Sequence, residues 1–212
     1  MKTPKYIAVD GGEGSGKSTL IKTLPDIFGE LVFTTREPGG SPDGKVIRRV
    51  LLNHPFSPMA GAEAELHLMF VDRYDHVKEV VKPKVDAGIC VVTDRSDASS
   101  WAYQVNAGSN IATRGILEAK FWEYRKGLVL VPLLYVVLDV DPEVGLSRRK
   151  ATNRVNHIDT RPIEFHQMVR RALLEFPNYI QSRSVIIDAN RPLEDVKKDF
   201  LAVIRREIGG FS

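Results

Sequence analysis

A glycine-rich segment near the N-terminus has the residue types that phosphate binding requires. Residues 11–18 read GGEGSGKS and fit the pattern G-x-x-x-x-G-K-[ST] in full. Glycines let successive backbone N–H groups turn toward phosphate oxygens. Lys17 supplies a mobile positive charge for the β- and γ-phosphates, and the Ser18 hydroxyl can ligate Mg²⁺. We therefore predict a nucleoside triphosphate site with these contact residues: Gly11, Gly12, Glu13, Gly14, Ser15, Gly16, Lys17, Ser18 and Thr19.

A second group could bind the phosphate of an acceptor. Asp94 and Arg95 directly follow an apolar run, at the end of a predicted strand where open α/β sheets bind their ligands. A monophosphate suits rigid guanidinium groups, so Arg95 is predicted to clamp it, assisted by Arg48 and Arg36. Asp94 could order Mg²⁺ and its water shell, or accept a hydrogen bond from Lys17. The alternatives are a local ion pair for Arg95 and a purely structural turn at Asp94.

The elements that position these groups alternate along the chain. Nearly continuous apolar runs predict five buried strands at 6–10, 31–35, 89–93, 133–138 and 184–188. Helical stretches are predicted at 17–28, 42–52, 61–86, 111–125, 142–150, 160–181 and 193–208. Strict alternation of strand and helix predicts an α/β fold, a five-stranded parallel sheet with helices on both faces. No repeat or linker interrupts the pattern, so residues 1–212 are predicted to form a single domain.

The composition and the absence of certain motifs exclude several classes of protein. The chain has 212 residues, a formal net charge of +3 and a single cysteine, Cys90. No signal peptide and no apolar run of about 20 residues is seen, so we expect a soluble, cytoplasmic protein with no membrane partner. The guanine-recognition signature of GTPases and the signatures of protein kinases are also missing from the sequence. A small-molecule phosphoryl acceptor remains.

Five segments, in order and in register, resemble the thymidylate kinase family. They are 35–40 (TREPGG), 68–73 (LMFVDR), 94–104 (DRSDASSWAYQ), 138–149 (LDVDPEVGLSRR) and 188–194 (DANRPLE). The resemblance implies a P-loop NTPase fold with a small lid at about 148–162, and transfer of the ATP γ-phosphate to dTMP to give dTDP. It further implies Mg²⁺ as cofactor and a homodimer that contacts its partner through the helix 61–86.

The resemblance also implies an acceptor site. Arg73 is expected to contact the pyrimidine edge, while the residue at the Met69 position stacks on the ring. The family usually has Phe there; here the Phe is displaced by one position, to Phe70, so either Met69 covers the base or the helix rotates to present Phe70. Ser100 and Gln104 could hydrogen-bond the polar edge of the base, or form a solvated helix face. The remaining expected acceptor-site residues are Arg36, Glu37, Pro38, Arg48 and Arg95.

Two departures leave the acceptor open. Ser96 stands where the family has Tyr or His, an aromatic residue thought to exclude ribonucleotides. Ser96 and Met69 favour a second interpretation. In it the protein is a deoxynucleoside monophosphate kinase with another or broader acceptor, such as dUMP, a modified pyrimidine or several dNMPs.

Catalytic arginines are expected in the lid, because no arginine lies between Gly11 and Lys17. Seven basic residues lie between 148 and 171: Arg148, Arg149, Lys150, Arg154, Arg161, Arg170 and Arg171. Such a run could be a solvated face or a nucleic-acid patch, but the family places it over the donor triphosphate, and we expect no nucleic-acid partner. Arg148 and Arg154 are the predicted catalytic arginines. Glu13 is expected to approach the acceptor sugar or to order a lid arginine, and Asn190 to lie beside adenine.

Overall fold

Five parallel strands form one sheet in the computed structural model, which describes residues 5–53, 61–152 and 156–209. The strands are β1 (Tyr6–Gly11), β2 (Val32–Arg36), β3 (Cys90–Asp94), β4 (Leu134–Asp139) and β5 (Arg183–Asp188). Their order is β2-β3-β1-β4-β5. All the pairings are parallel, so the carboxyl ends of the strands meet at one edge of the sheet. This confirms the predicted fold class.

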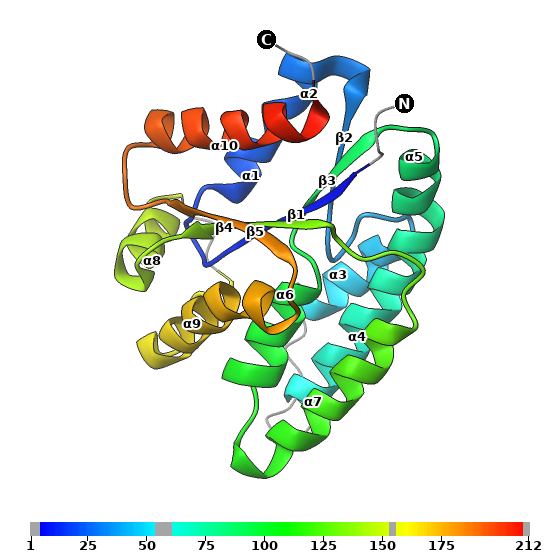
Figure 1. Ribbon diagram of the computed structural model, residues 1–212. Coiled ribbons are helices and arrows are strands. Elements are labelled where there is room, and N and C mark those ends of the chain that lie inside the picture. Colours follow the sequence, from blue (N-terminus) through cyan, green and yellow to red (C-terminus); the bar gives the residue numbers. More distant parts are fainter. Residues whose placement is uncertain (1–4, 54–60, 153–155, 210–212) are drawn as a thin grey trace.

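The helices cover both faces of the sheet (Figure 1). One face carries α1 (Lys17–Lys22), α2 (Leu24–Phe28) and α10 (Leu193–Ile208), whose apolar residues form one core with alternate strand residues such as Ile7 and Val136. The other face carries α4 (Gly61–His76), α6 (Asp97–Ser100), α7 (Ile111–Lys126) and α9 (Ile163–Tyr179), packed around Ala8, Tyr135 and Val137. Since successive strand residues point to opposite faces, β1 and β4 contribute to both cores.

The remaining elements lie at the ends of the sheet or extend these helices. They are the 3-10 turn Gly29–Leu31, α3 (Gly44–Asn53), the π-helical turns Val77–Val81 and Trp101–Ala107, α5 (Lys82–Asp86) and α8 (Pro142–Ala151). None of the described helices is long and apolar enough to cross a bilayer.

Three helix predictions needed correction, and proline lies at each difference. The helix expected over 17–28 is divided at Thr23, just before Pro25. The helix expected over 61–86 passes through a π-helical turn before Pro83, which has no N–H for the regular ladder. The helix expected from residue 160 begins after Pro162. Strand limits differ from the prediction by a single residue at most at each end.

Candidate active site

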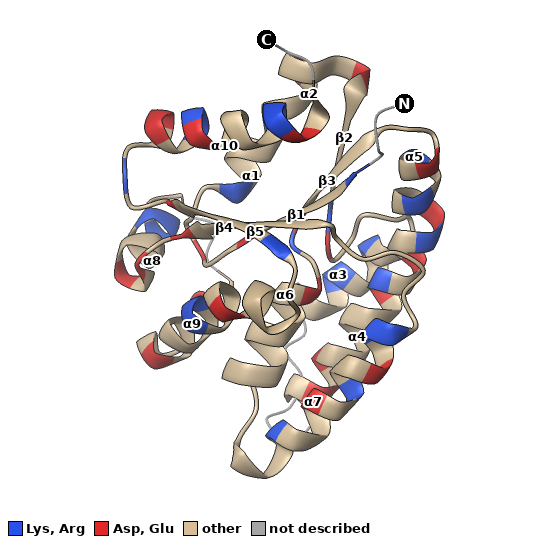
Figure 2. Ribbon diagram, in the orientation of Figure 1, with Lys and Arg blue, Asp and Glu red and all other residues tan. Residues whose placement is uncertain are grey.

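A large cavity lies at the carboxyl edge of the sheet, where the loops after β1, β2, β3 and β5 meet helix α8, which follows β4. Its volume is about 910 Å³. The lining is rich in positive charge, as a site for several phosphates requires. The lining Lys and Arg residues are Lys17, Lys22, Arg36, Arg48, Arg95, Arg148, Arg149 and Arg191, and the lining acids are Glu13, Glu37, Glu65 and Asp94. Figure 2 shows basic positions on α1, α3 and α8.

The glycine-rich loop is the turn between β1 and α1, as predicted. Lys17 Nζ donates to the carbonyl oxygens of Gly11 (2.7 Å) and Gly12 (2.9 Å) and to Ser15 Oγ (3.0 Å). Burial, and next the charge of Arg95, lower the pKa of Lys17 to about 8. Among the described residues no hydrogen bond joins Lys17 to Asp94.

The close packing of the phosphate loop against α8 explains why positions 14 and 145 are both glycine. Gly14 has φ 69°, and a Cβ there would collide with the carbonyl group of Gly145 on α8. A Cβ at Gly145 would in turn collide with the carbonyl oxygen of Glu13. The phosphate loop and α8 therefore pack backbone against backbone, which only glycine permits.

Ser18 and Asp94 come together across two strand ends. The Ser18 hydroxyl donates to Asp94 Oδ2 at 2.6 Å. A hydroxyl oxygen and a carboxylate oxygen are metal ligands of the kind that Mg²⁺ prefers. Within the described ranges no cluster of three or more His, Cys, Asp or Glu side chains is arranged to hold a metal. The pair therefore fits an ion whose remaining ligands are phosphate oxygens and water.

Glu13 and Arg95 form a buried cluster beside the loop. Arg95 Nη2 donates to Glu13 Oε1 (2.9 Å), Arg95 Nη1 donates to Ser99 Oγ (3.2 Å), and the guanidinium lies over the ring of Tyr103, 4.9 Å from its centroid. The Tyr103 hydroxyl donates to both Glu13 oxygens, and His166 Nδ1 lies 3.6 Å from Glu13 Oε2. Glu13 contacts no arginine of the lid among the described residues.

The charges in this cluster stabilise each other. Burial alone raises the pKa of Glu13, but the contact with His166 and the charges of Arg95 and Lys17 outweigh it and hold that pKa well below its usual range. Burial lowers the pKa of Arg95, but Tyr103 and Glu13 outweigh it and raise the pKa. Arg95 has φ 75°, a sparsely populated conformation for a non-glycine residue, and its N–H donates to Val9 O (3.0 Å).

Two further arginines border the cavity near Arg95. Arg48 Nη1 donates to the carbonyl oxygen of Pro38 (3.0 Å), and Arg36 is exposed at the end of β2. Burial, and next the charge of Arg36, lower the pKa of Arg48. Clustered guanidinium groups repel one another, and an anion between them relieves that repulsion. The three arginines predicted at the acceptor site, together with Pro38, therefore lie along one cavity.

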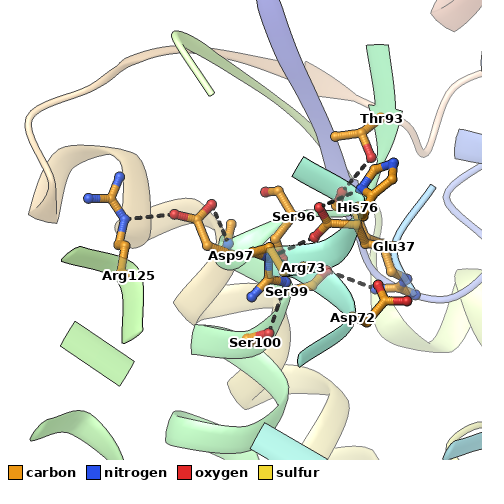
Figure 3. A network of polar contacts seen from close by, with 12 residues as sticks. Glu37, Asp72, Arg73, His76, Thr93, Ser96, Asp97, Ser99, Ser100 and Arg125 are labelled. Atoms are coloured by element: carbon orange, nitrogen blue, oxygen red, sulfur yellow. Dashed lines mark hydrogen bonds and ion pairs between the residues drawn. The ribbon is translucent and has the colours of Figure 1, made fainter. Parts of the chain in front are cut away.

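Arg73 lies behind the cavity lining, in a buried polar network (Figure 3). Its Nε donates to Glu37 Oε2 (2.7 Å), and its Nη2 donates to Ser96 O (2.8 Å) and Ser100 Oγ (3.1 Å). Glu37 Oε1 is 3.0 Å from His76 Nδ1. Nη1 is buried and has no hydrogen-bond partner in the described part of the chain. Arg73, predicted to contact the pyrimidine edge, therefore does not border the cavity in this structure.

This network changes how three predicted residues are interpreted. The side chain of Glu37, although it belongs to the lining, is committed to Arg73 and His76. Ser100 is fully buried, is not part of the lining, and accepts from Arg73 instead of facing the cavity. Ser96 turns its hydroxyl away from the cavity to Asp10 Oδ2 (2.8 Å). The sequence could not reveal these side-chain orientations, because each hydrogen bond joins residues that are far apart in sequence.

Of Met69 and Phe70, the structure brings only Met69 to the cavity. Met69 belongs to the lining, whereas Phe70 does not. Phe70 packs edge-on against Phe121 with centroids 5.6 Å apart, and the Arg73 guanidinium lies over its ring at 4.7 Å. Phe70 is thus a core residue, and the predicted contact of Phe70 with an acceptor is corrected.

Gln104 reaches the same end of the cavity as Met69. Its Nε2 donates to Glu65 Oε2 at 3.0 Å, and both side chains are buried and border the cavity. Leu51 and Leu52 of α3 supply apolar lining. Met69, Leu51 and Leu52 thus give the cavity apolar surface in addition to the fixed polar atoms of Glu65 and Gln104, which is typical of a site for a flat organic group.

The opposite end is bordered by α8 and the loop after β5. Arg148 donates to the carbonyl oxygens of Ala189 (2.7 Å) and Asn190 (3.0 Å), and Asn190 Oδ1 accepts from the N–H of Asp141 (2.8 Å). Arg149 Nε lies 3.2 Å from Asp159 Oδ1, within ion-pair distance. Arg154 lies outside the described residues.

Several lining or supporting residues were missed in the sequence. Ser99 and Tyr103 stand within the segment 94–104, and Glu65 comes one helical turn before Met69, so their spacing could have indicated them. Asp10 accepts from Ser99 Oγ (2.6 Å) as well as from Ser96. His166, on α9, is 153 positions from Glu13, and no local pattern could have paired them.

Comparisons with known proteins agree with this geometry. A family model described as thymidylate kinase matches residues 9–200. The thymidylate kinase of Protochlamydia amoebophila (strain UWE25) is 37% identical over 214 residues, covering 95% of this chain and 92% of that protein. Those of Caulobacter vibrioides (strain ATCC 19089 / CIP 103742 / CB 15) and Bacillus cytotoxicus (strain DSM 22905 / CIP 110041 / 391-98 / NVH 391-98) are each 35% identical. They cover 96% of this chain, and the alignments cover 97% and 98% of those proteins, respectively.

Proposed function

The chain belongs to the thymidylate kinase family, and we propose that it transfers the γ-phosphoryl group of ATP to dTMP, giving ADP and dTDP. The observation that carries this is the continuity of one cavity. The phosphate loop, Arg95 and the Met69–Gln104 end all border it. A donor phosphate and an acceptor phosphate can therefore meet near Arg95, with the acceptor's base at the Met69 end.

Lys17, Ser18 and Asp94 hold the donor phosphates in this proposal. Lys17 exchanges its loop carbonyl partners for phosphate oxygens, which satisfy the ammonium group better because they are charged. Ser18 and Asp94 are the residues that would hold Mg²⁺. The ion would neutralise charge on the β- and γ-phosphates. The Asn190 loop lies beside the adenine ring.

Arg95, Arg48 and Arg36 hold the acceptor phosphate. The partners of Arg95, namely Glu13, Ser99 and Tyr103, fix its guanidinium before substrate arrives, so little side-chain freedom is lost on binding. The attacking phosphate oxygen is already anionic and needs no strong general base. The rate then depends on bringing it in line with the γ-phosphate and on neutralising the charge that spreads over three equatorial oxygens.

The base lies at the Met69 end. Met69 covers the ring with a flat, polarizable thioether. Gln104, which borders the cavity, contacts N3 of the ring. The unpartnered Arg73 Nη1 is buried behind the lining in this structure, and it would donate to the O4 carbonyl of thymine only if the bound base brings it into the cavity. Ser100 and Glu37 contribute by holding Arg73.

Residues 148–162 form a lid over the donor, within a single P-loop kinase domain of residues 1–212. Arg148 and Arg154 supply the catalytic positive charge, since the phosphate loop has no arginine of its own.

We also propose that the protein works as a homodimer and in the cytoplasm. A free, buried Cys90 suits a reducing compartment, and exposed apolar residues on α4 suit a partner.

The proposal is tested by incubating the protein with ATP, Mg²⁺ and dTMP and quantifying dTDP and ADP by chromatography. Wild type is expected to form both in equal amounts. Lys17→Ala is expected to abolish transfer while melting near the wild-type temperature. Lys78→Ala, which removes a charge from a side chain that is 73% exposed, is the matched control and should remain fully active. Full activity in Lys17→Ala would contradict the assigned role, and no dTDP from wild type would contradict the function.

A further inference from the structure

Glu65 and Gln104 form an isolated polar pair at the base end of the cavity. Gln104 Nε2 donates to Glu65 Oε2 at 3.0 Å. Their side chains come from α4 and from the π-helical turn Trp101–Ala107, 39 residues apart in sequence, and both border the cavity. Glu65 is 9% exposed and Gln104 is 7% exposed, so water competes little for this hydrogen bond.

The chemistry of the pair fixes which way the amide points. A glutamine amide has a donor end and an acceptor end that are almost equal in shape, whereas a carboxylate can only accept. Glu65 therefore requires the NH₂ end of Gln104. The carbonyl oxygen Oε1 accepts no hydrogen bond from any described group, so it is the polar atom of Gln104 that remains for a ligand.

We propose that Glu65 is a positioning residue that sets base selectivity, by locking Gln104 so that it presents an acceptor to the base. This inference rests on the proposed function. Thymine and uracil carry a hydrogen on N3 and can donate to Oε1; cytosine N3 is an acceptor and faces Oε1 with no hydrogen between them.

The test is Glu65→Gln, with selectivity as the readout. A glutamine at 65 can accept or donate, so Gln104 can adopt both orientations and keep one hydrogen bond in each. We expect the ratio of kcat/KM for dTMP to kcat/KM for dCMP to fall roughly ten-fold or more, because a flipped Gln104 accommodates cytosine. Glu63→Gln is the matched control: Glu63 lies two positions earlier on α4, is half exposed and pairs with Lys120. It should leave the ratio unchanged.

The outcomes separate positioning from a structural role. Loss of activity toward both substrates with an unchanged ratio overturns the proposal, because a structural defect affects both alike. The double variant Glu65→Gln/Gln104→Glu reverses the hydrogen bond and again presents only an acceptor, so it should recover most of the dTMP preference; a folded double variant without that preference also overturns it.

If Glu65→Gln does not fold, the wild-type complex with dTMP decides. Gln104 must lie within about 3.2 Å of N3 while it keeps its hydrogen bond to Glu65. A Gln104 side chain turned away from Glu65 in that complex overturns the proposal. If wild type forms no dTDP at all, the proposed function fails, and this inference fails with it. Turnover of dTMP with equal turnover of dCMP overturns the inference alone.

Discussion

Lys17 is the residue whose environment most directly links structure to a measurable pH dependence. It is buried against its own loop, and burial followed by the nearby Arg95 lowers its pKa to about 8. The free protein therefore loses the Lys17 charge as the pH rises above about 8, and with it part of its attraction for phosphates.

We accordingly expect kcat/KM for ATP to fall above pH 8, approaching ten-fold per pH unit, since this parameter reports the ionisation of the free enzyme. The value of kcat at saturating ATP should fall only at higher pH, because bound phosphates favour the charged lysine. Steady-state kinetics from pH 7 to 10 measures both. A kcat/KM for ATP that stays flat to pH 9.5 would show that burial does not control this lysine.

At the scale of elements, the contact between the phosphate loop and α8 is the most constrained one. Gly145→Ala places a methyl group against the carbonyl oxygen of Glu13. Although alanine favours helices, we expect this variant to lose about 1–3 kcal/mol of stability through overpacking and to bind ATP more weakly.

Gly115→Ala on α7 is its matched control, because a Cβ there meets no atom within 4 Å. That variant should gain up to about 1 kcal/mol from helix propensity alone. Thermal melting and ATP titration measure both effects. If the Gly145→Ala protein were as stable as the Gly115→Ala protein, α8 could move away from the loop without loss of folding stability.

The lid proposed at residues 148–162 supplies a second prediction at this scale. Arg154→Ala should lower kcat by several orders of magnitude and leave KM for dTMP nearly unchanged, because an inserted guanidinium stabilises charge that develops only during transfer. Arg149→Ala, which breaks the pair with Asp159, should reduce kcat less. If Arg154→Ala changed only KM for dTMP, the catalytic charge would have to come from elsewhere.

For the molecule as a whole, the proposed homodimer makes a prediction about exposed apolar residues on α4, where we propose that the partner subunit packs. Val71 is 56% exposed and Tyr74 is 37% exposed. We expect sedimentation to give twice the 23.7 kDa mass of one chain, and Val71→Glu to shift the mass toward that of a single chain. Ile186→Glu, at a similarly exposed position on the edge strand β5, should not. A wild-type protein that sediments as a monomer would refute the dimer.

Sequence periodicity was sufficient for the architecture and insufficient for the site. Strands buried on both faces are continuous apolar runs, so β1, β3 and β4 could be located almost to the residue. The glycine-rich loop was equally clear, because its chemistry is contained in eight consecutive residues. Contacts between distant segments, such as His166 with Glu13 or Arg73 with Glu37, leave no local signal. The displacement of Phe from 69 to 70 could be resolved only when α4 was seen to turn Met69 toward the cavity and Phe70 toward Phe121.

The central claim, phosphorylation of dTMP by ATP, is tested most directly by a panel of monophosphates with the wild-type protein. Values of kcat/KM are measured with ATP and Mg²⁺ for dTMP, dUMP, dCMP and dGMP. We predict that dTMP is the best substrate. We expect dUMP to follow within roughly 10–200-fold, the usual value of one methyl group, and dCMP and dGMP to be lower still because they oppose Arg73 and Gln104. No turnover of dTMP would contradict the central claim, whereas turnover of dCMP or dGMP as fast as dTMP would contradict only the base selectivity assigned to this site.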